Sequence, residues 1–246
     1  MNEKIAHKAV LIYPEFDTQN TFWSYAQSLK MYAPASEFGL PKRLLPPLGL
    51  MGLFNHLKPF YDELCLIDKN IDPRPISEFI ADADHVYIGG MMAQEQSLLK
   101  LGLEVKKARK ILIVGGTAIS QQSPLMQVAD HLLENEAEGV IDELLAGLSK
   151  ANAKKYYQGS FVAAEHFFQP DYAAINMQNY VHMAVQISRG CPERCEFCDI
   201  PSRFGKAFRV TPWQKTEQSF QQMKDLGWTG QVFVVDDNFI GNPRKA

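Results

Sequence analysis

The chain has 246 residues, of which 46% are hydrophobic and 22% are charged, and its formal net charge is -3. This balance is typical of a globular protein with one large domain or two of ordinary size. The basic residues form no stripe, so we expect no nucleic-acid partner. No apolar run approaches the ~18 residues that a membrane span requires, and the start lacks the pattern of a signal peptide. The cysteines are too few for a disulfide framework, and their clustering favours the reducing cytoplasm.

Residues 1–150 alternate the patterns of strands and helices. Short apolar runs predict buried strands, and longer stretches with apolar residues at helical spacing predict helices. Strands are expected at 8–13, 63–68, 85–90 and 110–116, with a short one after 128, and helices at 46–58, 95–108 and up to 150. Strands separated by helices of this length predict a parallel, doubly wound α/β sheet over 1–150.

Residues 151–180 predict a less regular connector, and a second unit is expected over 181–246. A strand at 183–188 is followed at once by a loop that contains three cysteines. A helix is predicted over 211–227, because Thr211 is a suitable N-cap and Gly227 a suitable C-terminal stop. A further strand is predicted at 231–239.

The three loop cysteines are Cys191, Cys195 and Cys198, at the spacing C-x3-C-x2-C. Thiolates are soft ligands, so zinc and iron–sulfur clusters are the candidates. A structural zinc site normally uses two C-x2-C pairs or a Cys-Cys-His-His set, and His182 is the only histidine nearby. Three thiolates on a [4Fe–4S] cluster would leave its fourth iron open, which indicates chemistry rather than a structural role. Structural zinc stays open as an alternative.

The stretch "CPERCEFC" resembles the signature of radical S-adenosylmethionine enzymes. The resemblance implies that the three thiolates hold a [4Fe–4S] cluster, that S-adenosylmethionine binds the fourth iron, and that one electron cleaves it to a radical. It also implies a partial (β/α) barrel with the cluster loop after its first strand, and Phe197 beside the adenine. Because barrel sites lie at the carboxyl ends of strands, we expect Asp236, Asp237 and Asn238 to contact S-adenosylmethionine.

Two predicted strands end in glycine pairs, Gly89–Gly90 and Gly115–Gly116. A doubly wound sheet binds ligands at this edge, and glycine lets the backbone approach a large flat ligand closely. The phrases "LCLIDKNI", "IGGMMAQ" and "LIVGGTAIS" resemble a cobalamin-binding domain, which implies that these glycines contact cobalamin. No histidine lies in an Asp-x-His-x-x-Gly motif, so we expect no protein nitrogen on cobalt.

The phrases "FWSYAQSLKMYA", "PPLGL" and "VFVVDDNFIGN" look closest to the radical S-adenosylmethionine subgroup that includes the hopanoid C2 methylases. This resemblance implies transfer of a methyl group from methylcobalamin to an unactivated carbon of a lipid or another small-molecule substrate. Glu136 and Glu138 match a phrase of that family, but we interpret them as acidic residues that suit the dipole of the following helix.

A (β/α) barrel averages about 30 residues per strand–helix unit, and 66 residues follow from Val181 onward. We therefore expect only the first barrel units, a truncated chain that is inactive alone, and an open strand edge that invites a second chain. One alternative stays open beside the structural zinc protein and the radical methyltransferase: a non-catalytic cobalamin-binding module with a vestigial cluster loop. The short second unit is expected to reflect a truncated gene, a split subunit or a gene fragment.

Overall fold

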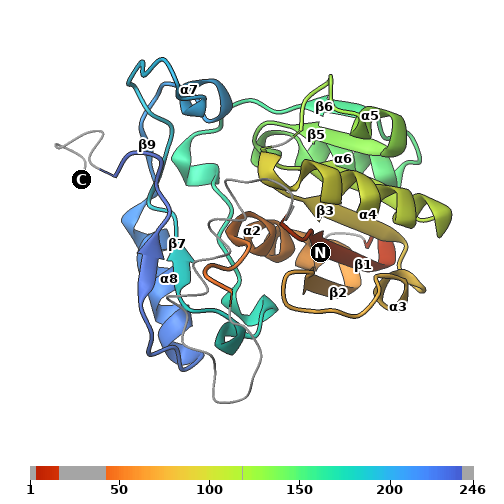
Figure 1. Ribbon diagram of the computed structural model, residues 1–246, viewed down its shortest axis with the longest axis horizontal. Helices are drawn as coiled ribbons and strands as arrows, with labels where there is room; N and C mark the ends of the chain where they lie inside the picture. The colour runs from red at the N-terminus through yellow and green to blue at the C-terminus, as the bar shows by residue number, and fades with distance from the viewer. Residues whose placement is uncertain (1–3, 17–42, 118, 240–246) are drawn as a thin grey trace.

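The computed structural model describes residues 4–16, 43–117 and 119–239. Within these ranges the largest element is a six-stranded, parallel sheet of order β2-β1-β3-β4-β5-β6 (Figure 1). Its strands are β1 (Ala6–Tyr13), β2 (Tyr61–Asp68), β3 (His85–Gly89), β4 (Ile111–Gly115), β5 (His131–Glu134) and β6 (Tyr156–Gln158). The order reverses between β1 and β3, which is the topological switch point of a doubly wound sheet.

Helices cover both faces of this sheet. One face packs against α3 (Ser77–Ile80), α4 (Glu95–Lys107) and α5 (Leu125–Val128), and the other against α2 (Leu48–Leu57) and α6 (Ile141–Ser149). The strands alternate their side chains between two cores, so that Val10 and Ile12 face the first while Ala9 and Leu11 face the second. The predicted doubly wound α/β fold is confirmed.

The sheet extends into the segment that the sequence assigns to the connector. Tyr156–Gln158 forms β6, which pairs in parallel with β5. A three-residue strand is too short to show a period in the sequence. The described 3-10 helices are short, with bounds Lys58–Phe60, Met92–Gln94, Ala137–Gly139, Ala164–His166, Tyr172–Ala174 and Met177–Asn179.

The second unit is a parallel strand–helix–strand arrangement of β7 (Met183–Val185), α8 (Trp213–Asp225) and β10 (Val232–Val234). The cysteine loop lies between β7 and α8 and contains a short antiparallel pair, β8 (Ser188–Arg189) and β9 (Arg209–Val210), and the helix α7 (Ile200–Arg203). This is the predicted order of strand, loop, helix and strand.

Three local predictions of this unit were wrong. The strand expected at 231–239 is limited to Val232–Val234, because the side chains of Asp236, Asp237 and Asn238 bind the cysteine loop instead of continuing the strand. The strand expected at 183–188 breaks after Val185, because the backbone N–H groups of Ile187 and Ser188 donate to the Asp236 side chain. Thr211 is not the N-cap of α8: the cap position is Pro212, and the Thr211 hydroxyl lies 3.3 Å from the Gln186 carbonyl oxygen, to which it donates.

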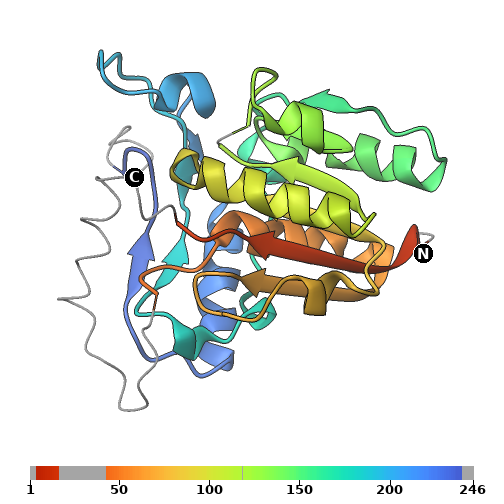
Figure 2. The same cartoon turned by 45° about the vertical axis from the view of Figure 1, so that its right-hand side comes forward.

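Helix α2 packs against both units. Its Leu50, Leu53 and Phe54 belong to the core under the sheet, whereas Met51 belongs to a third core that includes Met183 and Met223. Figure 2 shows β1 pointing toward the β7–α8–β10 unit, so the carboxyl edge of the sheet faces that unit. Across the described residues, no helix combines the length and apolarity that crossing a bilayer requires.

Candidate functional site

The predicted glycine pairs meet at the carboxyl edge of the sheet. Gly89 at the end of β3 is the register partner of Gly115 at the end of β4, and all four glycines line a cavity of about 1530 Å³. This volume exceeds the ~300–1,000 Å³ of typical small-ligand pockets. The structure therefore places a space for a large ligand where a doubly wound sheet is expected to bind one.

The cavity lies between the two units. Its walls include the start of α2, the ends of β1, β3 and β4, the inner side of β7 and α8, and the stem of the cysteine loop. Within the described residues of this wall, His182 is the single histidine, and Arg189 and Arg203 come from the cysteine loop. Cys191, Cys195 and Cys198 lie outside the wall.

Protein packing explains part of the glycine pattern. Gly116 has φ +112°, and a Cβ there would lie 2.3 Å from the carbonyl oxygen of Gly90, so no other residue fits. A Cβ on Gly89 would lie 2.8 Å from Leu50, whereas one on Gly115 would make an ordinary contact of 3.6 Å with Leu133. Contact of these glycines with cobalamin stays a prediction.

Gly49 gives a different result. It lies in the first turn of α2 and lines the cavity, and a Cβ there would meet no atom of the described residues within 4 Å. Packing therefore does not require glycine at this position, although glycine weakens a helix by about 1 kcal/mol relative to alanine. A ligand that approaches the backbone would explain this residue. Gly49 lies within the phrase "PPLGL", where no local signal in the sequence distinguishes it.

The three loop cysteines are free thiols in different environments: Cys191 is buried, Cys198 is half-buried and Cys195 is exposed. The Cys198 backbone N–H donates to the Cys195 carbonyl oxygen at 3.1 Å, so these two are held by one turn. Across the part of the chain that the structure describes, no three Cys, His, Asp or Glu side chains converge on one metal position.

The predicted S-adenosylmethionine contacts follow β10 at its carboxyl end, and their side chains hold the cysteine loop. Asp236 accepts from the N–H groups of Ile187 at 2.7 Å and Ser188 at 3.0 Å. Asp237 accepts from Gly190 N–H at 3.1 Å. Burial raises the pKa of Asp237, and this hydrogen bond opposes the shift.

Asn238 completes the series, because its Nδ2 donates to the sulfur of Cys191 at 3.4 Å. Phe197 is 93% exposed. For these residues, contact with S-adenosylmethionine stays a prediction.

A buried ion-pair cluster joins the sheet to the cysteine loop; it consists of Glu136, Glu138, Arg189 and Arg209. Arg209 binds both carboxylate oxygens of Glu136 at 2.7 Å, and the two side chains are 11% and 3% exposed. Arg189 pairs with Glu138 at 2.9 Å and lies 4.1 Å above the ring centroid of Phe167. Short bidentate arginine–carboxylate pairs of this kind fix orientation as well as distance.

This cluster corrects the interpretation of Glu136 and Glu138 as helix-dipole residues. Both carboxylates are buried and ion-paired, and α6 begins only at Ile141. Sequence reasoning missed Arg189 and Arg209 altogether. The sequence does show one arginine on each side of the cysteine motif. Their acidic partners lie tens of residues away, so the ion pairs cannot be predicted from local spacing.

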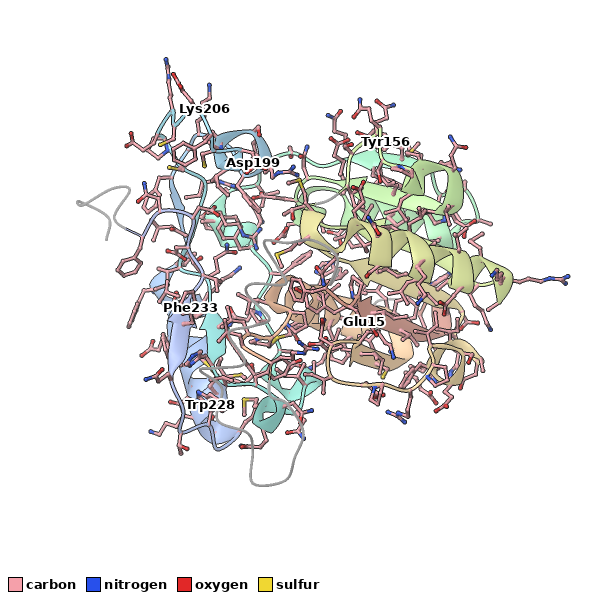
Figure 3. The ribbon with its side chains drawn as sticks, in the orientation of Figure 1. Glu15, Tyr156, Asp199, Lys206, Trp228 and Phe233 are labelled. Atoms are coloured by element: carbon pink, nitrogen blue, oxygen red, sulfur yellow. The ribbon has the colours of Figure 1, made fainter. Side chains whose placement is uncertain are left out.

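Helix α7 places the cysteine loop against the glycine edge. Arg203 donates to the carbonyl oxygen of Thr117, which follows Gly116, and also contacts the sulfur of Met92. Arg203 is oriented by an ion pair with Asp199, which Figure 3 labels on this helix. The cysteine loop and the ends of β3 and β4 therefore lie side by side at one end of the cavity.

The opposite end of the cavity contains a buried carboxylate. Asp68 accepts from the Asn70 backbone N–H and side chain, both at 2.8 Å, and from the Tyr180 hydroxyl at 3.0 Å. Burial raises the pKa of Asp68, and these hydrogen bonds oppose the shift. With its oxygens bound in this way, Asp68 shapes the turn after β2 rather than offering a free carboxylate.

Comparison with solved structures supports the fold. No family model matches the chain. OxsB, solved with aqua-cobalamin and S-adenosylmethionine bound, aligns with a TM-score of 0.68 and 14% identity over 96% of this chain and 35% of that chain. The radical S-adenosylmethionine methyltransferase TsrM from Kitasatospora setae aligns with a TM-score of 0.68 and 13% identity over 95% and 48%. The chain thus has the α/β fold of cobalamin-binding radical S-adenosylmethionine enzymes.

The sequence relatives are methyltransferases. An uncharacterized methyltransferase of Synechocystis sp. is 34% identical over 250 residues, which cover 97% of this chain and 43% of the relative. The hopanoid C-2 methylase of Rhodopseudomonas palustris is 30% identical over 207 residues, or 82% of this chain and 39% of the relative. The chain is therefore homologous to methyltransferases and spans less than half the length of these two relatives.

Proposed function

We propose that the chain supplies the cobalamin-binding and cluster-binding portion of a radical S-adenosylmethionine C-methyltransferase. The observation that carries this proposal is the position of the cysteine loop. Arg203 of the loop donates a hydrogen bond to the carbonyl oxygen of Thr117, directly after Gly116, at the edge of a cavity of about 1530 Å³. The chemistry of two large cofactors requires their sites to lie side by side, and this geometry supports that arrangement.

The residues present fit both cofactors. Three free thiols on one loop are a donor set suited to an iron–sulfur cluster. Gly49 leaves room at the cavity wall, as a cofactor that touches the backbone of α2 needs. When bound, the cluster would supply an electron to S-adenosylmethionine, and cobalamin would supply the methyl group. The residues of this chain would then hold the two groups at adjacent edges and exclude water between them.

The substrate is proposed from the relatives. The name of the hopanoid C-2 methylase supports a lipid or another substrate with an unactivated carbon. We also propose that β10 pairs with a further strand, from this polypeptide or a second chain, because among the described residues β7 is its only strand partner, and its Phe233, labelled in Figure 3, is 52% exposed. An exposed apolar strand edge favours pairing with another strand. The free thiols support a cytoplasmic location.

The test is anaerobic reconstitution of the chain with iron and sulfide, followed by addition of hydroxocobalamin. We expect about four irons per chain with broad absorbance near 400 nm, lost in C191A, C195A and C198A, and one corrinoid retained on gel filtration. A matched control is C65A, since Cys65 lies on β2 away from the loop. The H182A variant should leave the corrinoid spectrum unchanged, as expected without a protein nitrogen on cobalt.

The outcomes separate the alternatives. Corrinoid binding without iron supports a cobalamin-binding module with a vestigial loop. One zinc and no chromophore supports the structural zinc protein. Either result overturns the proposal. A spectrum that changes in H182A would contradict only the prediction about cobalt.

A further inference from the structure

Three consecutive residues after β10 hold three successive points of the cysteine loop. The parallel pairing of β10 with β7 continues for one step, because Val235 N–H donates to the Val185 carbonyl oxygen at 2.9 Å. Beyond Val235 the hydrogen bonds between the two backbones end, and side chains of the segment after β10 bind the cysteine loop instead. Asp236 binds Ile187 and Ser188, Asp237 binds Gly190, and Asn238 binds Cys191, as described above.

Two further features fix the cysteine loop against the segment after β10. Asp236 also accepts from the Ser188 hydroxyl at 2.7 Å, and Ser188 is 1% exposed. Gly190 has φ +85°, and a Cβ there would lie 2.4 Å from the Ala207 carbonyl oxygen. This left-handed turn is open to glycine alone. It directs the Cys191 sulfur toward Asn238 while the Cys191 N–H donates to Gly205.

We propose that Asp236, Asp237 and Asn238 are positioning residues that preorganise the cysteine loop, and that the Asn238 amide N–H tunes the sulfur of Cys191. This inference rests on the proposed function only for the cluster; the contact itself is between two side chains of this chain. It gives these three residues a role different from the contact with S-adenosylmethionine that the sequence predicts.

The tuning follows from charge. A ligating thiolate that accepts a hydrogen bond gives less electron density to the iron, and the reduced cluster carries one more negative charge than the oxidised one. The N–H donor therefore stabilises the reduced state more, which raises the reduction potential. Removing it should shift the reduction equilibrium about tenfold toward the oxidised state, or ~59 mV for one electron.

The first arm of the test uses the metal-free chain and thiol labelling. Iodoacetamide labelling of Cys191, read by mass spectrometry against exposed Cys195 in the same molecule, reports whether the loop is held. N238L removes the amide donor, and we expect Cys191 to label about fivefold faster. N238Q keeps a donor and should stay within about twofold of the wild type. N55L is the matched control: Asn55 donates to the Gln169 carbonyl oxygen at 3.0 Å, away from the loop.

The second arm uses reconstituted protein and a potentiometric titration followed by electron paramagnetic resonance. N238L should lower the cluster potential by ~59 mV, with N238Q and N55L close to the wild type. Unchanged Cys191 labelling in N238L overturns the positioning role, and an unchanged potential overturns the tuning. A wild-type chain that takes up no iron would refute the proposed function and with it the tuning, while the labelling arm still decides the positioning role.

Discussion

Glu136 provides the sharpest test of how the two units are held together. It accepts two hydrogen bonds from Arg209 and a third, at 2.8 Å, from the Val162 N–H, and its side chain is 3% exposed. E136Q keeps the shape of the side chain and removes its charge. Arg209 then lies buried without its carboxylate, although its other bonds, to the Val162 and Phe204 carbonyl oxygens, remain.

The magnitude follows from burial. Removing one partner of a buried ion pair costs about 3–5 kcal/mol, because the remaining charge loses its compensation. Glu138 still pairs with Arg189, so we expect the lower end, about 3 kcal/mol. At roughly 2–4 °C per kcal/mol for a chain of this size, the unfolding midpoint of E136Q should fall by about 6–12 °C.

The assay is thermal unfolding followed by circular dichroism, with urea unfolding as a second measurement. E143Q is the matched control, since the Glu143–Lys154 pair has side chains 54% and 66% exposed and is screened by water. Its midpoint should stay near that of the wild type. Equal midpoints for E136Q and E143Q would refute the reasoning that the ion-pair cluster holds the cysteine loop on the sheet.

Three further predictions concern single positions. G116A should lower the free energy of unfolding measured in urea by about 2 kcal/mol or more, whereas G115A should change it by less than about 1 kcal/mol. Of these two glycines, Gly116 is the one that combines a positive φ with a close backbone contact. Burial lowers the pKa of His85, so the unfolded chain binds its proton first as the pH falls below about 6.5. Stability is then lost with falling pH, and H85N should flatten the slope of unfolding free energy between pH 7 and 5. F233K should reduce self-association in sedimentation velocity, since it places a charge on the open edge of β10.

Each of these has a contradicting result. Equal losses in G116A and G115A would mean that the backbone contact at Gly116 relaxes. An unchanged slope in H85N would mean that His85 is not protected from protons in the folded state. Identical sedimentation of F233K and wild type at every concentration would mean that β10 does not drive association.

The fold could be predicted because its signals are local. Four strands of the sheet are short apolar runs, and the helices between them show the spacing of one buried face. The strand β6 escaped prediction because Tyr156–Gln158 is too short for a period. The break after Val185 escaped because a carboxylate 49 residues further on competes for the backbone N–H of Ile187.

The candidate site could be predicted only in part. The cysteine spacing and the glycine pairs are contiguous in sequence, and Gly89 and Gly115 proved to be neighbours in the sheet. The partners that orient the cysteine loop come from several other segments of the chain, so their contacts depend on the packing of the two units. Asp236 illustrates the difference: its place at a strand end was predictable, but the loop amides that it binds were not.

The attachment of the cysteine loop to the segment after β10 has a consequence for biosynthesis. Cys191 leaves the ribosome 47 residues before Asn238, the group that binds its sulfur. During that interval the Cys191 thiol is present without its amide partner, while Glu136, Glu138 and Thr117, the partners of the loop arginines, are already synthesised. The Cys191–Asn238 contact can therefore form only after translation has passed residue 238, which makes it a late step in the assembly of the cysteine loop.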